Sequence, residues 1–312
     1  MAKLMIFSGS SHGDLAAAIA KKMGVPLSKT QISRFACGET YARPIETVRG
    51  RDVFIIQTTT HDVNENLMEL FIMLDALKRS FASKIHVVMP YYAYSRQDRV
   101  SVPREPISAK LVADLLSTAG ADHVITMNLH SGQEQGFFDY PVDNLSSYGL
   151  FVDYLKKKKL KDMVIVSPDA GGAKEAKKVA DEVGAGIAFI HKHRVAFNVS
   201  KAMEVIGNVK GKTCVIYDDI IDTGGSVCNA REALIKAGAN KEMYLIATHP
   251  VFSDPAVQRL KDAKFKEVVV TDSVPLPKEK QFPGLKVISI APMMAKIIEN
   301  VHSDRSVSQI IK

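Results

Sequence analysis

The stretch that decides the fold is VIYDDIIDTGGS, residues 215–226. It opens as an apolar strand through Tyr217, continues with Asp218, Asp219 and Asp222, and ends in a loop of glycines and hydroxyl residues. The segment that follows, SVCNAREALIKAG, has the apolar spacing of an amphipathic helix. This succession of strand, polar loop and helix is typical of a parallel α/β sheet, in which ligands bind beyond the carboxyl ends of the strands.

The same unit recurs along most of the chain. Apolar segments alternate with helical ones; the apolar segments are KLMIFSG, DVFIIQT, IHVVMP, HVITMNLH, MVIVSPDAGG, IAFIHKHR, EMYLIATHP and EVVVTDS. Because these strands are apolar on both sides, we expect mainly parallel sheets that are flanked by helices on both faces. The prediction is an α/β fold of two domains, residues 1–147 and 148–312, with the extreme C-terminus packing back on the N-terminal domain.

The composition limits the partners. The 312 residues carry a net charge of +7, which suits anionic partners but does not distinguish nucleic acids from small phosphates. The aromatic residues are not interleaved with basic runs, as a stacking platform for single strands requires. The densest basic run, residues 156–159, reads as the solvated end of a helix. We therefore expect no nucleic-acid partner.

The cysteines and the first residues indicate a compartment. Cys37, Cys214 and Cys228 are odd in number and have no CxxC spacing, which is typical of a reduced protein. The opening MAKLMIFSGS has an apolar run too short for a signal peptide or a membrane span. We expect a cytoplasmic protein without a membrane partner.

The loop at the end of the 215–226 stretch can hold a phosphate. Gly224 and Gly225 let the backbone turn tightly, so that successive N–H groups point into one cavity. The following helix adds its free N–H groups and its positive dipole end, and the loop's threonine and serine add hydroxyls. Ionised carboxylates only accept hydrogen bonds, so Asp218 and Asp222 suit the two hydroxyls of a ribose. A helix cap with solvated acids is the alternative.

The stretch resembles the 5-phosphoribosyl-diphosphate motif of the phosphoribosyltransferase fold. With its other motifs, nearly the whole chain resembles the ribose-phosphate pyrophosphokinases, also called phosphoribosyl-pyrophosphate synthetases. These motifs are FSGSSHGDLA, FACGET, NENLMEL, SRQDR, REPISAKLVADLL, GADHVITMNLHSGQEQGFFDYPVDNL, SPDAGGAKEAKKVA, HKHR and RSVSQI. The resemblance implies two phosphoribosyltransferase-type domains and a diphosphotransferase. ATP would give its β,γ-diphosphoryl group to the anomeric hydroxyl of ribose 5-phosphate, yielding 5-phosphoribosyl 1-diphosphate and AMP.

The resemblance also assigns residues to the reaction. Lys192 and Arg194 match the family's catalytic basic pair, since phosphoryl transfer is catalysed largely by positioning and by cations. His130 and Asp169 match positions at the metal, which we expect to be Mg²⁺. The residues that match the sugar-phosphate site are Arg194, Asp218, Asp219, Asp222, Thr223, Gly224, Gly225 and Ser226. An exposed charged loop, a structural histidine and a helix cap are the alternatives for Lys192 with Arg194, for His130 and for Asp169.

Nucleotide contacts are implied for two segments of the N-terminal half, FACGET and SRQDR. The matching residues for ATP are Phe35, Cys37, Gly38, Glu39, Arg96 and Gln97. Phe35 would stack on the base, and the second segment would reach across a subunit interface. Ordinary turn chemistry at Gly38 and a surface ion pair of Arg96 with Asp98 are the alternatives.

Family members of this length imply a homo-oligomer, a hexamer built from dimers. Inorganic phosphate and ADP would be effectors at an allosteric site between subunits, with Arg49, Arg104, Ser306 and Ser308. Two positions depart from the pattern. Phe81 replaces a small hydroxyl residue, which weakens the expectation of ADP inhibition. Asn128 replaces an aspartate found in many relatives, which argues against a second all-protein metal site, although Mg²⁺ is held largely by substrate phosphates and water.

Other functions remain open at this point. A phosphoribosyltransferase would share the 215–226 motif but would consume the product, and the N-terminal half speaks against it. A non-catalytic regulatory subunit of such a synthetase would often lack catalytic elements, which this chain retains. A nucleic-acid binder would show salt-sensitive binding to oligonucleotides.

Overall fold

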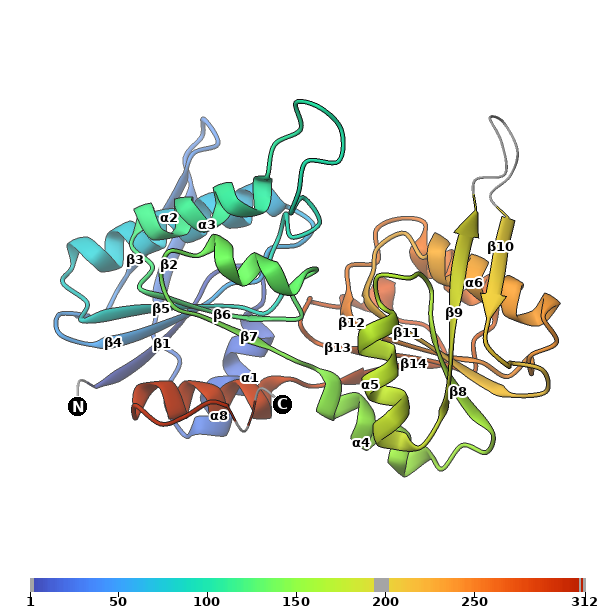
Figure 1. Cartoon of the computed structure of the whole chain (residues 1–312). Helices are drawn as coiled ribbons and strands as arrows, with labels where there is room; N and C mark the ends of the chain where they lie inside the picture. Colours follow the sequence, from blue (N-terminus) through green and yellow to red (C-terminus); the bar gives the residue numbers. More distant parts are fainter. Residues whose placement is uncertain (1–2, 194–201, 309, 311–312) are drawn as a thin grey trace. The chain divides into compact units, whose positions relative to one another are not determined.

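The computed structural model describes residues 3–193, 202–308 and 310 and divides the chain into two compact units (Figure 1). The first unit contains Met1–Ser146, Ser273–Pro275 and Ser289–Lys312. The second contains Ser147–Asp272 and Leu276–Ile288. The C-terminal end of the chain is therefore part of the first unit.

The first unit is built on a five-stranded parallel sheet in the order β1-β4-β5-β6-β7. Its strands are β1 (Leu4–Ser8), β4 (Asp52–Ile56), β5 (Lys84–Met89), β6 (His123–Met127) and β7 (Val142–Leu145). Four helices cover it: α1 (Gly13–Met23), α2 (Val63–Arg79), α3 (Ser108–Ala119) and α8 (Ala291–His302). Figure 1 shows α2 and α3 on one face and α1 and α8 on the other. Every residue of β4 is buried, because both faces of this strand are covered.

A small antiparallel hairpin is added to this unit. It pairs β2 (Thr30–Arg34) with β3 (Thr40–Pro44), and β3 packs against α2. At its tip Gly38 has φ 96°, which favours glycine, and its N–H donates to the carbonyl of Phe35 at 2.9 Å. The sequence pattern did not predict these strands, because their residues are mostly polar and half-exposed.

The second unit holds a seven-stranded sheet in the order β10-β9-β8-β11-β12-β13-β14. Its strands are β8 (Met163–Ser167), β9 (Gly186–His193), β10 (Ala202–Ile206), β11 (Thr213–Ile221), β12 (Tyr244–Pro250), β13 (Glu267–Thr271) and β14 (Leu285–Ile288). All neighbours are parallel except β9 and β10. The helices are α4 (Tyr148–Lys158), α5 (Ala173–Val183), α6 (Gly225–Lys236) and α7 (Ala256–Ala263). Of two short 3₁₀ helices, η2 (Lys278–Lys280) belongs to this unit and η1 (Gly132–Phe137) to the first.

Strand β11 shows how the sequence specifies this layering. Cys214 and Ile216 join the apolar core beneath α6 and α7, whereas Val215 and Tyr217 join the core beneath α4 and α5. Successive side chains of a strand point to opposite faces, so a continuously apolar strand needs a helical layer on each side. The prediction of an α/β fold with mainly parallel sheets flanked by helices is confirmed.

Candidate active site

The loop between β11 and α6 has the backbone form of a phosphate cradle. Strand β11 continues past Tyr217 to Ile221, so Asp218 and Asp219 lie within the strand, as the predicted strand TCVIYDDIID has it. Gly224 caps α6 with φ 74°. Thr223 and Ser226 are exposed on either side of it. The free N–H groups of the first helical turn therefore lie beside two exposed hydroxyls.

Carboxylates gather at the same edge of the sheet. Asp218 and Asp219 are half-buried, and the backbone N–H of Asp219 donates to Asp218 Oδ1 at 2.9 Å. Burial raises the pKa of Asp218 well above its usual range, and the negative charges of Asp219 and Asp169 raise it further. This repulsion favours a ligand that brings hydrogen-bond donors or a cation.

Asp169 reaches this edge because β8 and β11 are neighbours in the sheet. Its carboxylate Oδ1 accepts a hydrogen bond from the backbone N–H of Gly172 at 3.0 Å, just before α5 begins. The Ser167 hydroxyl donates to the carbonyl of Asp169 at 2.6 Å. A Cβ atom at Gly172 would lie 2.8 Å from Ser167 Oγ, so a larger residue there would displace the Ser167 hydroxyl. Asp169 is thus held by its own loop, and it retains oxygen atoms that can bind a metal.

Arg259 is a residue of the phosphate loop that sequence reasoning missed. It lies on α7, and its Nη1 donates to the carbonyl of Thr223 at 3.0 Å. A Cβ atom at Gly225 would lie 3.5 Å from the same nitrogen and 3.9 Å from Thr223 Oγ1. The guanidinium therefore borders the loop and adds a positive charge there. No local motif marks Arg259, because packing of α6 against α7 brings it to the loop.

The expected basic pair cannot be placed at this site. The backbone of Lys192 belongs to β9, where it pairs with Met203 of β10. The side chain of Lys192 and the whole of Arg194 lie outside the described residues.

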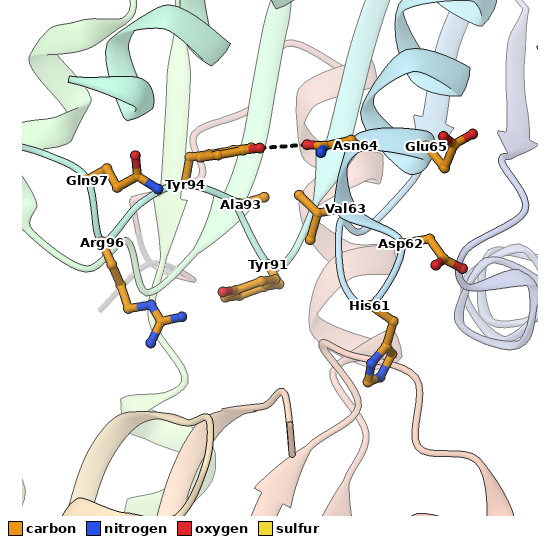
Figure 2. Close-up of a pocket in the computed structure, with 10 residues that line it drawn as sticks. All are labelled: His61, Asp62, Val63, Asn64, Glu65, Tyr91, Ala93, Tyr94, Arg96 and Gln97. Carbon is orange, nitrogen blue, oxygen red and sulfur yellow. Dashed lines mark hydrogen bonds between the residues drawn. The ribbon is translucent and has the colours of Figure 1, made fainter. Parts of the chain in front are cut away.

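The first unit contains a cavity of about 470 Å³ near the ends of its strands (Figure 2). Arg96 and Gln97 both line it, so the structure brings these two predicted nucleotide residues together. Tyr94 also lines the cavity, and its hydroxyl donates to Asn64 Oδ1 at 2.5 Å. The remaining lining residues are His61, Asp62, Val63, Glu65, Tyr91 and Ala93. Aromatic rings with a guanidinium and amides can contact a base and a phosphate group.

His130 is attached to the segment that carries Arg96. It follows β6, which ends at Met127, and its backbone N–H donates to Ser95 Oγ at 2.9 Å. Asn128, the departure noted in the sequence, has φ 44°, a left-handed conformation that asparagine tolerates better than most residues. The chain therefore turns sharply between β6 and His130.

The hairpin tip is separate from the cavity lining. Phe35 is 56% exposed and makes an edge contact with Tyr41, with ring centroids 6.0 Å apart. Among the described residues that line the cavity, the hairpin tip contributes none of its four candidates, which are Phe35, Cys37, Gly38 and Glu39. An ion pair of 3.0 Å between Arg34 and Glu65 nevertheless joins the hairpin to the cavity wall. The tip is thus exposed and can contact a ligand or another subunit.

The expected allosteric residues form separate groups. The guanidinium of Arg49 lies 4.8 Å from the ring centre of Phe81, which is 67% exposed. Ser306 Oγ donates to Ser308 Oγ at 3.2 Å. Arg104 occupies an exposed loop with φ 75°. The chain on its own therefore presents these residues as exposed groups.

In the part of the chain that is described, no three His, Cys, Asp or Glu side chains meet in a cluster able to hold a metal ion. Over the same part, every helix is too short or too polar to cross a bilayer.

Comparisons with known proteins show the family of the chain. Residues 4–120 match the family model for the N-terminal domain of ribose phosphate pyrophosphokinase, and residues 192–312 match the phosphoribosyl synthetase-associated domain. The ribose-phosphate pyrophosphokinase of Fusobacterium nucleatum is 49% identical over 98% of this chain and 97% of its own length. That of Bacillus cereus is 50% identical over 98% of this chain and 96% of its own length.

A solved structure extends the likeness to the whole fold. Phosphoribosylpyrophosphate synthetase from Mycobacterium smegmatis is 45% identical, with a TM-score of 0.93 over 97% of this chain and 99% of that chain. The resemblance found in the sequence is therefore confirmed. With both family models matched and half of the residues shared with such relatives over nearly the full length, this chain belongs to the ribose-phosphate pyrophosphokinase family.

Proposed function

We propose that this chain transfers the diphosphoryl group of ATP to the anomeric hydroxyl of ribose 5-phosphate, giving 5-phosphoribosyl 1-diphosphate and AMP. The observation that carries the proposal is the edge of the second sheet, where a glycine-capped helix start lies beside three aspartates of two neighbouring strands and their loops. One end of this edge suits a phosphate and the other suits hydroxyl donors or a cation. A sugar phosphate carries both a phosphate group and hydroxyl donors in one molecule.

The ribose 5-phosphate binds on the loop from Asp222 to Ser226. Its phosphate accepts hydrogen bonds from the first N–H groups of α6 and from the hydroxyls of Thr223 and Ser226. Its ribose hydroxyls donate to the carboxylates of Asp218, Asp219 and Asp222, which only accept when ionised. Arg194 belongs to the same site by resemblance and lies outside the described residues.

ATP binds in the first unit. Arg96 and Gln97 line a cavity with room for a nucleotide portion, and His130 is tied to the same segment by its backbone. By resemblance, the exposed hairpin tip with Phe35, Cys37, Gly38 and Glu39 completes the nucleotide site, and the tip and the segment with Arg96 and Gln97 would meet across a subunit interface. Its exposure supports this role, because an exposed tip is free to reach another chain.

A kinase-type transferase needs a metal ion, and we propose Mg²⁺. Asp169 and Asp218 offer oxygen donors. Burial raises the pKa of Asp218, and the neighbouring negative charges raise it further, which a cation would offset. Since the described residues form no complete protein cage, the ion would share its ligands between ATP phosphates and Asp169, and the resemblance also implies a role for His130 at the metal-bound nucleotide. When bound, Mg²⁺ would neutralise charge on those phosphates.

The transfer is an in-line displacement. The anomeric oxygen forms a bond to the β-phosphorus, and the bond from that phosphorus to the α,β-bridging oxygen breaks. AMP leaves with that oxygen, and the proton of the anomeric hydroxyl passes to solvent. Lys192 and Arg194 stabilise the negative charge on the transferred group, a role that rests on the resemblance.

The resemblance also supports a proposal for assembly, regulation and location. We place the enzyme in the cytoplasm, where ATP is supplied and where its three free cysteines stay reduced. A homohexamer built from dimers would bring Arg49, Arg104, Ser306 and Ser308 of neighbouring subunits together as a site for phosphate and ADP. Phe81 is exposed beside Arg49, at the position where the family pattern has a small hydroxyl residue.

The test is to incubate the chain with ATP and Mg²⁺, with and without ribose 5-phosphate, and to measure AMP. We expect AMP only with the sugar phosphate, and a loss of rate of at least about hundredfold in Lys192→Ala. Lys156→Ala is the control, because Lys156 pairs with Glu182 on an exposed helix. Equal AMP release without the sugar, or an undiminished rate in Lys192→Ala, would contradict the proposal. Consumption of 5-phosphoribosyl 1-diphosphate with a free base would instead indicate a phosphoribosyltransferase.

A further inference from the structure

Glu134 is a buried acid that the proposed chemistry does not use. It lies in η1 with an exposed fraction of 0%. Its two carboxylate oxygens lie 2.9 and 2.7 Å from Ser95 Oγ, which donates to them, and the backbone N–H of Ser131 donates to Oε1 at 2.7 Å. Burial raises the pKa of Glu134, and these hydrogen bonds partly offset the rise. Because a buried carboxylate is costly, its hydrogen-bond partners indicate what it organises.

Ser95 connects Glu134 to His130. While its hydroxyl donates to Glu134, its oxygen accepts the backbone N–H of His130 at 2.9 Å. A continuous chain of hydrogen bonds therefore runs from the amide of His130 through Ser95 to Glu134, and returns to the amide of Ser131. The consecutive backbone amides of His130 and Ser131 are therefore held by the side chains of Ser95 and Glu134. Hydrogen bonds in such a chain strengthen one another.

The same pair also fixes the wall of the cavity. Ser95 lies in a turn closed by the N–H of Gln97, which donates to the carbonyl of Tyr94 at 2.8 Å. Tyr94, Arg96 and Gln97 all line the cavity, whereas Ser95 is buried beneath them. The buried member of the turn is thus the one bonded to Glu134 and His130.

We propose that Ser95 and Glu134 are positioning residues that hold Arg96 and His130 in register for one nucleotide. This inference rests on the proposed function, which gives both of those residues a role at ATP. The segments are far apart in sequence, since Ser95 and Glu134 are separated by 39 positions. Removing either side chain would leave the two segments without this bond, and a displacement of about 1 Å at such a site can reduce activity by about a hundredfold.

A purely structural role for the pair is the rival explanation, and the chain contains a matched control for it. Glu69 is also buried and accepts hydrogen bonds from the backbone N–H and the hydroxyl of Ser10, each at 2.7 Å. Its further partner is Gln57, whose Nε2 donates to it at 2.8 Å. The Ser10–Glu69 pair has the same chemistry in the same unit and holds a different segment of the chain.

The experiment compares Ser95→Ala, Glu134→Ala, the double variant and Glu134→Gln with Ser10→Ala. Binding of Mg-ADP to the full chain is measured by calorimetry, and the part that a non-hydrolysable ATP analogue displaces is assigned to the ATP site, apart from the proposed effector site. KM for each substrate and kcat are measured by AMP release, and folding by thermal unfolding. We expect Ser95→Ala and Glu134→Ala to weaken Mg-ADP binding and to raise KM for ATP about tenfold, with KM for ribose 5-phosphate changed less than about twofold. The double variant should be no worse than the worse single one.

The controls separate position from stability. Glu134→Gln keeps an acceptor for Ser131 and a partner for Ser95, so it should restore nucleotide binding to within about threefold of the native chain. Ser10→Ala should lower the unfolding temperature without changing KM for ATP. If Glu134→Ala does not fold, Ser95→Ala decides the question alone.

Native nucleotide binding in folded Ser95→Ala would overturn the inference, as would an equal loss of binding in Ser10→Ala. A native chain that binds Mg-ADP but releases no AMP would refute the proposed function, while the binding data would still test the pair.

Discussion

The two glycines of the phosphate loop should respond to alanine in opposite ways. Gly224 has φ 74°, where a Cβ atom costs about 1–2 kcal/mol, while its nearest new contact, Ala256 Cα at 3.5 Å, is ordinary. The backbone of Gly225 is not in that region. Its added Cβ would lie 3.5 Å from Arg259 Nη1 and 3.9 Å from Thr223 Oγ1, which places it between two polar groups of the proposed cradle.

The magnitudes follow from these positions. Gly224→Ala should destabilise the second unit by about 1–2 kcal/mol, a fall in unfolding temperature of about 2–8 °C. Gly225→Ala should leave stability unchanged or raise it by about 0.4–1 kcal/mol, since alanine restricts the unfolded chain. The methyl group of Gly225→Ala should also displace one hydrogen bond to the charged phosphate. Such a bond contributes about 1.5–3 kcal/mol, so ribose 5-phosphate binding should weaken about 10- to 150-fold.

The assay pairs thermal unfolding with calorimetric titration of ribose 5-phosphate for both variants and the native chain. Mg-ADP binding is the internal control, and it should be the same in all three. The reasoning fails if Gly225→Ala binds ribose 5-phosphate like the native chain, or if Gly224→Ala is as stable as the native chain.

Three further results are expected. Arg259→Ala should raise KM for ribose 5-phosphate about fivefold with little change in KM for ATP, because one exposed charge-assisted hydrogen bond to the loop is lost. The control is Arg231→Ala: Arg231 also lies on the helical layer, in α6, but its Nη2 donates to the carbonyl of Lys241 at 3.2 Å, so both KM values should stay unchanged. The reverse pattern would refute the role of Arg259. Removing divalent metal with a chelator should abolish AMP release and added Mg²⁺ should restore it, whereas full activity without metal would exclude the proposed ion. Asp52→Asn should lower stability by about 3 kcal/mol at pH 7. Although burial alone would raise the pKa of Asp52, hydrogen bonds with His86 and His302 hold it below the usual 3.8, so this stabilisation is present above that pH and is lost as pH falls through the lowered pKa. The measurement is the unfolding temperature of the native chain and of Asp52→Asn at acidic and neutral pH. If the difference between the two unfolding temperatures does not shrink in acid, the stabilising role of the Asp52 carboxylate is contradicted.

The layered fold was predictable because its signals are local. Strands such as Asp52–Ile56 are apolar throughout and the helices between them are amphipathic, so the parallel sheets with two covered faces follow from the pattern. The hairpin of Thr30–Arg34 and Thr40–Pro44 was missed because its strands are short, polar and half-exposed. The end of β11 was predicted within one residue, since TCVIYDDIID reads as one strand and the ladder continues through Asp218 to Ile221.

The site was predictable where one segment carries its own chemistry. The loop from Asp222 to Ser226 combines glycines, hydroxyls and a helix start within a few residues, and motif matching adds the nucleotide residues. Arg259 and Glu134 could not be found in this way. Arg259 contacts Thr223 only because α6 and α7 pack together. Glu134 lies in a polar stretch of sequence that suggests exposure, but in the structure it is buried and hydrogen-bonded to Ser95, which is distant in sequence.

A crystal structure of the chain with ribose 5-phosphate tests the central claim most directly. We expect the phosphate to accept hydrogen bonds from the first amides of α6 and from the hydroxyls of Thr223 and Ser226, with the ribose hydroxyls on Asp218 and its neighbouring acids. A sugar phosphate bound at another place, with this glycine loop empty, would contradict the account.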